Sequence, residues 1–355
     1  MSTVGRPEDA PDRVAAALGD AGFVRLIATA DGDALAATGL LARALGAVEV
    51  PYQASLAAVP EISSTDADCI VAVGHPTGDI VLRSEPLAAA AFDVARELSP
   101  ESADPTLALA GAFCAGQEPT GELLEAAGVK RRPGIALPTD DRTDLAWSTL
   151  VHTPFSGNER ATRATLAELD AEDGRTLASF VALSAVSDAP PRASGAVERA
   201  LRPYACDRFE TLGGYADVLS AVAHDAPGAG IALALGYGNE TAALEAWRAH
   251  GKRAHDALRS ADTGRYAGLL VNRVDENAPL GSVARLSLAY RSPEPVVLVV
   301  TDGEAAVAAE EPVGDALVEA ATACGGRAVE RSTNGTARFD GDATEFVTAF
   351  REART

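Results

Sequence analysis

Apolar and polar positions follow two different periods near the start of the chain. A short, continuously apolar run over 23–28 predicts a buried strand, and a polar turn over 29–33 follows it. From 34 to 45 the apolar residues recur at helical spacing, which predicts a helix. Further apolar runs at 48–56 and 69–73 predict two more strands. Continuously apolar strands that alternate with helices are typical of a parallel sheet covered on both faces.

The rest of the pattern divides the chain in two. It is mainly helical from Pro86 to about Leu201, apart from a loop at 129–144, and becomes mixed after Tyr204. In this later part the pattern predicts strands at 266–271, 295–300 and 336–339, and helices at 240–259, 314–324 and 343–353. We therefore expect an α/β protein with a boundary near residue 200, which separates a first domain at 1–200 from a smaller mixed α/β domain at 201–355.

Length and composition agree with two folded domains. The 355 residues exceed one ordinary domain, and 47% hydrophobic with 23% charged residues excludes wholesale disorder. No apolar run approaches the ~18 residues of a membrane span. The first nine residues also lack the apolar core of a secretory signal. We expect a soluble, cytoplasmic protein with no membrane partner.

The charge balance is strongly acidic. Asp and Glu total 51 against 30 Lys and Arg, which gives a net charge of −21, and only Lys130 and Lys252 are lysines. An acid-rich, lysine-poor surface spread along the whole chain favours a halophilic protein, since molar salt screens the repulsion between carboxylates. The alternative is a protein of ordinary salt that repels nucleic acid. Under the halophilic interpretation, net charge says little about partners.

Two carboxylates flank a glycine at the end of the first predicted strand. Asp31, Gly32 and Asp33 lie where a parallel sheet places its ligands, at the carboxyl edge of the strands. Both carboxylates could face a hard divalent cation, with the glycine allowing the tight turn. The alternative is an ordinary turn in which Asp33 caps the following helix, so that Asp33→Ala would destabilise the fold by about 1 kcal/mol.

These residues carry a family resemblance. The stretch 31–41 (DGDALAATGLL), after an apolar strand, resembles the first motif of the DHH phosphoesterases. That superfamily includes the RecJ single-strand exonucleases, small oligonucleotide phosphatases and a RecJ-derived subunit of the replicative helicase. A second resemblance, to the DHH-associated C-terminal domain, rests on segments that follow one another in order at 279–285, 293–300, 302–304, 325–326 and 346–350. The two matches together reach from about residue 23 to residue 350.

The resemblance implies a fold, a chemistry and a substrate. The fold would be a DHH-like parallel sheet flanked by helices, followed by a smaller mixed α/β domain that holds single-stranded substrate through a Gly-Gly-His loop. The chemistry would be phosphodiester hydrolysis by water activated between two metal ions, manganese or magnesium. In that loop, Gly325 and Gly326 precede Arg327 where the family has histidine, and Arg331 lies nearby. An arginine still offers a forked phosphate contact, and the alternative is a solvated turn with scattered surface arginines.

Several metal ligands of the family are missing. Ile27 stands where the family has His or Asp, the second strand ends at Gly74 and His75 instead of an aspartate, and Ala115 replaces a further aspartate. No Asp-His-His triplet exists in the chain. A two-metal clamp needs about six protein ligands. Asp31, Asp33 and His75 supply three at most, so we expect one weakly held manganese or magnesium ion, or none, and name no catalytic residue.

One further pair of side chains raises a catalytic hypothesis. His152 and Ser156 in a predicted loop resemble a base and a nucleophile, but no Gly-x-Ser-x-Gly elbow accompanies them, so a loop with a helix start is favoured. The sequence as a whole therefore predicts a RecJ-like protein that binds single-stranded nucleic acid in replication or repair, with a replication or repair protein as partner. The favoured function is a non-cleaving scaffold; the alternative is an active metal-dependent exonuclease or oligonucleotide phosphodiesterase.

Overall fold

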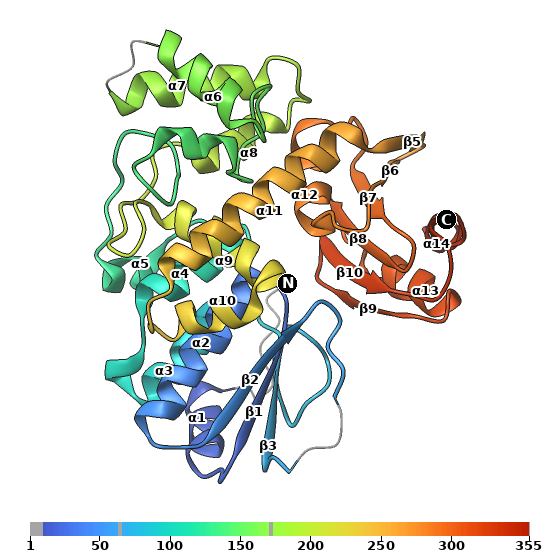
Figure 1. Ribbon diagram of the computed structural model, residues 1–355. Helices are drawn as coiled ribbons and strands as arrows, with labels where there is room; N and C mark the ends of the chain where they lie inside the picture. The colour runs from blue at the N-terminus through green and yellow to red at the C-terminus, as the bar shows by residue number, and fades with distance from the viewer. Residues whose placement is uncertain (1–9, 63–65, 170–172, 355) are drawn as a thin grey trace. The chain divides into compact units, whose positions relative to one another are not determined.

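The computed structural model describes residues 10–62, 66–169 and 173–354 (Figure 1). The chain divides into two compact units, each built from two stretches: 1–130 with 205–246, and 131–204 with 247–355. This division differs from the expected boundary near residue 200, because helices after residue 204 pack against helices of the N-terminal part. Within the described ranges, no helix combines the length and the apolar character that a bilayer crossing requires.

The first unit contains a parallel sheet of four strands. The strands are β1 (Val24–Thr29), β2 (Tyr52–Ala57), β3 (Cys69–Val73) and β4 (Ile80–Leu82), in the order β2-β1-β3-β4. β1 is central and buried, as its continuous apolar run predicts. The strand, turn, helix sequence at its end is confirmed, with the helix at Gly32–Ala47.

Helices pack on this sheet and on one another. They are α1 (Pro11–Gly19), α2 (Gly32–Ala47), α3 (Leu87–Leu98), α4 (Pro105–Cys114), α5 (Gly121–Ala127), α9 (Leu212–Asp225) and α10 (Pro227–Ala234), with a 3₁₀ turn at Pro100–Ser102. The helix α2 packs against β1 and β2 on one side and against α3, α4 and α9 on the other, so it is buried along almost its whole length. The start of α2 is therefore held by several elements at once.

The second unit contains a mixed sheet of six strands. These are β5 (Asp262–Tyr266), β6 (Leu269–Arg273), β7 (Val296–Val300), β8 (Glu304–Ala309), β9 (Arg327–Glu330) and β10 (Asn334–Arg338), in the order β5-β6-β7-β8-β10-β9. Only β6 and β7 pair in parallel, and every other neighbouring pair is antiparallel. The predicted mixed α/β domain is confirmed.

Helices cover both faces of the mixed sheet. The helices on the sheet are α8 (Ala193–Ala200), α11 (Glu240–Ser260, which begins in the first unit), α12 (Leu280–Tyr290), α13 (Gly314–Ala323) and α14 (Ala343–Ala353). Beside them, α6 (Glu159–Glu168), the 3₁₀ turn at Arg142–Ala146 and much of α7 (Gly174–Val186) form a further hydrophobic cluster. Alternate residues of β7 face opposite cores: Leu298 packs with α13 and α14, and Val299 with α12 and the end of α11. A strand buried on both faces reads as the continuous apolar run seen at 295–300.

Candidate functional site

Asp31 is the N-cap of α2. Its backbone is extended, with φ −136° and ψ 161°, and its Oδ1 accepts a hydrogen bond of 2.9 Å from the amide of Ala34. Its Oδ2 accepts one of 2.6 Å from the hydroxyl of Thr29. Both carboxylate oxygens therefore take part in ending β1 and starting α2. Sequence reasoning assigned this cap to Asp33, and that assignment was wrong because α2 begins two residues earlier than the predicted helix.

Asp33 caps a different helix. It is 2% exposed, and its Oδ2 and Oδ1 accept hydrogen bonds of 2.8 and 2.9 Å from the amides of Leu87 and Ala88. Those residues form the first turn of α3, whose own N-cap, Pro86, has no side-chain cap. A carboxylate at a helix N-terminus satisfies amides that have no partner within the helix and interacts favourably with its dipole. Asp33 thus joins α2 to α3.

Gly32 lets other helices approach the start of α2. A Cβ at this position would lie 2.5 Å from Cys114 Sγ and 2.9 Å from Ser220 Oγ. The Cys114 thiol donates to the backbone oxygen of Ala216 at 3.2 Å. Burial raises the pKa of this thiol, so it stays protonated. The glycine between the two aspartates is therefore required by close packing, independently of any cation.

Asp217 on α9 joins the two aspartates of the loop, and sequence reasoning missed it. It is 2% exposed, and its negative charge acts with those of Asp33 and Asp31 to raise the pKa of Cys114 further. The one signal for it in the sequence is an acidic residue inside the otherwise apolar stretch that became α9. Among the described residues, however, these carboxylates and Cys114 do not form a group of three donors within 4.8 Å.

His75 lies just beyond β3 and contacts the neighbouring strand. It is 5% exposed, and its Nε2 donates to the backbone oxygen of Ile27 at 2.9 Å. Burial lowers the pKa of this imidazole, which is therefore neutral near pH 7. The proton on Nε2 leaves Nδ1 as its acceptor atom. His75 is thus anchored at the position where the family resemblance implies a metal ligand, residue 27.

The donors at this edge of the sheet do not fit a two-metal centre. In the described part of the chain, Asp31, Asp33 and His75 do not come together as a three-donor group within 4.8 Å. Ile27 offers an apolar side chain, Gly74 a backbone at φ 80° and Ala115 the end of α4. One weakly held ion at Asp31, Asp33 and His75 stays a prediction.

The two glycines of the C-terminal loop are explained by packing. Gly325 has φ 71° and its amide donates to Thr322 O, so it ends α13 in the left-handed conformation that favours glycine. A Cβ on Gly326 would lie 2.0 Å from the backbone oxygen of Arg338. Only glycine fits where the chain passes this close to β10.

The arginines that follow lie on the β9–β10 hairpin. Arg327 begins β9, is exposed, and pairs across the ladder with Arg338 of β10. Arg338 forms an ion pair of 2.9 Å with Glu304 of β8. The backbone of Arg331 closes the hairpin by donating to Asn334 O at 2.8 Å. The structure therefore brings Arg327 and Arg331 to one hairpin, and nucleic-acid binding by Gly325, Gly326 and these arginines stays a prediction.

Comparison with known proteins places the chain in a family. A family model described as the C-terminal domain of "Uncharacterized protein rrnAC1427" matches residues 261–352. Over 99% of its length, the chain is 50% identical to Uncharacterized protein rrnAC1427 of Haloarcula marismortui, which is covered completely. The chain belongs to the rrnAC1427 family. The family model falls within the second unit, where it spans β5 to α14 almost completely.

Solved structures identify the fold of this rrnAC1427 family member. The chain resembles CDC45 from Entamoeba histolytica with a TM-score of 0.51 and 10% identity, over 97% of this chain and 98% of that one. It also resembles RecJ from Thermus thermophilus in complex with Mg²⁺, with a TM-score of 0.47 and 17% identity over 98% of this chain, but it spans only 55% of that RecJ. The first likeness, at this identity, shows the fold alone. The predicted α/β fold, a parallel sheet flanked by helices and followed by a mixed α/β domain, is confirmed.

Proposed function

We propose that this protein binds single-stranded nucleic acid as a non-cleaving scaffold in replication or repair. The observation that carries the proposal is the hydrogen bonding of Asp33, whose two carboxylate oxygens accept from the amides of Leu87 and Ala88. To bind a metal ion through these oxygens, Asp33 would have to release the N-terminus of α3. The family positions occupied by Ile27, Gly74 and Ala115 supply no side-chain donor in compensation.

The binding part of the proposal rests on the C-terminal hairpin. Arg327 follows the two glycines and is exposed, and Arg331 lies at the other end of β9. A guanidinium forms charge-assisted, bidentate hydrogen bonds with phosphate. Phosphate contacts of this kind position a strand without reading its sequence. We therefore infer that the hairpin holds the backbone of a single strand.

A second candidate function is an active metal-dependent exonuclease or oligonucleotide phosphodiesterase. The observation in its favour is that the negative charges of Asp31, Asp33 and Asp217 all raise the pKa of the Cys114 thiol. Three carboxylates therefore gather near the start of α2. Carboxylate oxygens are the ligands that magnesium and manganese prefer. Under this alternative, one such ion would bind there, and the capping bonds of Asp33 would give way to it.

We also infer the setting in which the protein works. Its 50% identity to a Haloarcula marismortui protein and its net charge of −21 support a halophilic, cytoplasmic protein. High salt weakens contacts with phosphates, because counterions released into a concentrated salt solution gain less entropy. We therefore propose that a replication or repair protein holds the scaffold at its site of action and adds to its affinity for a strand.

Strand binding is tested by fluorescence anisotropy with a labelled single strand and the matching duplex at fixed salt. Replacement of Arg327 with Ala should weaken single-strand binding by about 1–3 kcal/mol if it makes a charge-assisted phosphate contact. The matched control is Arg163→Ala, since Arg163 is another exposed arginine of the same unit, paired with Glu159 on α6. If Arg327→Ala and Arg163→Ala bound the single strand with equal affinity, the hairpin would be a solvated turn with no role in binding.

A further inference from the structure

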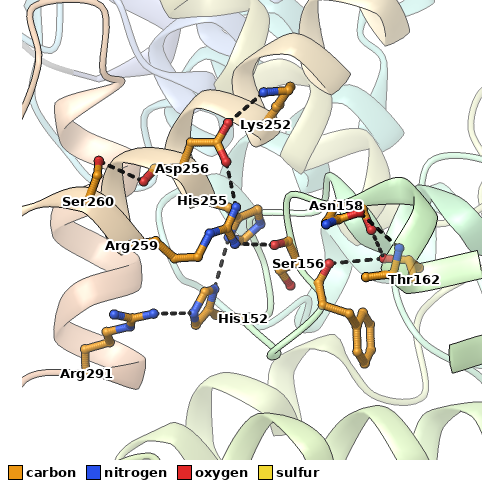
Figure 2. Close-up of polar contacts among 12 residues, drawn as sticks. His152, Ser156, Asn158, Thr162, Lys252, His255, Asp256, Arg259, Ser260 and Arg291 are labelled. Carbon is orange, nitrogen blue, oxygen red and sulfur yellow. Dashed lines mark hydrogen bonds and ion pairs between the residues drawn. The ribbon is translucent and has the colours of Figure 1, made fainter. Parts of the chain in front are cut away.

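Two histidines far apart in the sequence meet inside the second unit. His152 lies between the 3₁₀ turn at Arg142–Ala146 and α6, and His255 is fully buried on α11. Their Nδ1 atoms are 3.1 Å apart, and the rings stack with centroids at 5.2 Å (Figure 2). His152 does not serve Ser156, whose hydroxyl bonds to Thr153, so the base and nucleophile hypothesis finds no support in this geometry.

The hydrogen bonds fix the tautomers of both rings. Arg291 can only donate, so His152 Nε2, 3.3 Å from its guanidinium, is an acceptor. The proton of His152 is then on Nδ1, which donates to Nδ1 of His255. His255 in turn carries its proton on Nε2 and donates to the backbone oxygen of Ser148 at 2.9 Å. Both imidazoles are neutral, and together they tie Arg291 to the backbone.

Arg291 lacks a counter-ion. Within the described residues its guanidinium makes the one hydrogen bond to His152 and no ion pair. The neighbouring Arg259 differs, because it donates to Ser156 O and pairs with Asp256 at 2.6 Å (Figure 2). Four of the five N–H donors of Arg291 are left for another partner.

The electrostatic environment of this arginine is positive. Arg291 is exposed, but partial desolvation lowers its pKa, and the charge of Arg259 lowers it further. The pKa of His152 falls to about 3, because of burial and then because of His255, Arg291 and Arg259. Asp256, the carboxylate of this cluster, pairs with Arg259 and with Lys252. An anion beside Arg291 would relieve the repulsion between the guanidinium groups.

We propose that Arg291 is the anchor of a binding site for a phosphate-type oxyanion. Its planar fork matches two oxygens of a phosphate group, and Arg259 adds a second positive charge nearby. The His152–His255 pair positions the fork through the contact at His152 Nε2, and so acts through Arg291. The site lies entirely within the second unit, on α11, at the C-terminal end of α12 and on the segment before α6. It does not depend on the hairpin at Arg327 or on the proposed function.

The first test measures binding of inorganic phosphate by calorimetry, in potassium glutamate at constant ionic strength. Arg291→Gln should weaken binding at least tenfold, the loss expected for about one hydrogen bond to a charged group. Arg163→Gln is the control, because it removes an exposed arginine of the same unit that already has a carboxylate partner. Phosphate also stabilises proteins by exclusion from their surface, and that effect is common to both variants. Equal binding by wild type and Arg291→Gln would overturn the proposal.

Two further variants separate the charge of Arg291 from its geometry and test the role of His152. Arg291→Lys retains the charge without the fork, so it should bind phosphate more weakly than wild type and more tightly than Arg291→Gln. His152→Asn should weaken phosphate binding while its melting temperature is followed in parallel. If the affinity of His152→Asn for phosphate equals that of wild type, the positioning role of the imidazole pair is refuted.

The source of the phosphate is decided by single strands with and without a terminal phosphate. Tighter binding of the phosphorylated strand that is lost in Arg291→Gln would support the site and identify a strand end as its ligand. Binding of inorganic phosphate without that preference would support the site and identify a free anion. A protein that binds no strand would refute the proposed function while the phosphate result still stands. Absence of both kinds of phosphate binding overturns the site.

Discussion

The replacement of Asp33 by alanine separates a helix-capping carboxylate from a metal ligand. The change removes both hydrogen bonds to the first turn of α3 and leaves the amides of Leu87 and Ala88 buried without that partner. Each hydrogen bond to a charged group contributes roughly 1.5–3 kcal/mol. Removal of the buried charge itself relieves some desolvation, which offsets part of the loss. We expect Asp33→Ala to lower the free energy of unfolding by about 3 kcal/mol.

Asp31→Ala provides the comparison. Asp31 is the N-cap of α2, and loss of such a cap lowers stability by about 1 kcal/mol. Urea unfolding in 2 M potassium chloride, followed by circular dichroism, measures both variants. Two equivalent metal ligands would instead give similar losses of stability at Asp31 and Asp33. Asp33→Ala within 0.5 kcal/mol of wild type, or a large stabilisation of wild type by manganese that Asp33→Ala abolishes, would refute the capping argument.

Three further predictions concern salt, packing and pH. The melting temperature should fall by several degrees between molar and 0.1 M potassium chloride, because the 51 carboxylates repel with less screening; a flat profile would count against a halophilic origin. Gly326→Ala should destabilise the fold by about 2–3 kcal/mol, because its Cβ would lie 2.0 Å from Arg338 O. The control is Gly281→Ala on α12, whose Cβ meets nothing within 4 Å and which should not destabilise the fold. Similar melting temperatures for the two variants would contradict this prediction. The pKa of His152 is lowered to about 3 in the folded protein, against a value near 6.5 in the unfolded chain. Between these two pH values only the unfolded chain takes up the proton. The free energy of unfolding that is present above pH 6.5 is therefore lost progressively as the pH falls. Urea unfolding at pH 7 and 5.5 should show a loss of at most about 1.4 kcal/mol that is missing in His152→Asn; the same loss in the variant would argue against a neutral, buried His152.

Local patterns predicted the elements that depend on neighbouring residues. The apolar run at 23–28 and the polar turn after it are sufficient to predict β1 and the start of α2. The contacts of Asp33 were beyond such reasoning, because Leu87 and Ala88 lie more than 50 residues further along the chain. A carboxylate next to a glycine looks the same in sequence whether it binds a cation or the amides of a distant helix.

The composition of the two units was also beyond sequence patterns. Residues 205–246 follow the long helical segment, yet α9 and α10 pack against α2 of the first unit. Their apolar faces are predictable, but the choice of surface that covers them is a long-range property. The pairing of His152 with His255 has the same origin, since their spacing of 103 residues carries no periodic signal.

Metal-dependent degradation of a labelled single strand in molar potassium chloride tests the central claim most directly. The purified protein is incubated with manganese while anisotropy reports binding and gel electrophoresis reports the strand's length. We expect the strand to be bound and to stay intact, with manganese and without it. Shortened products that require manganese and disappear in Asp31→Ala would contradict it, and would show that Asp31 holds a catalytic ion.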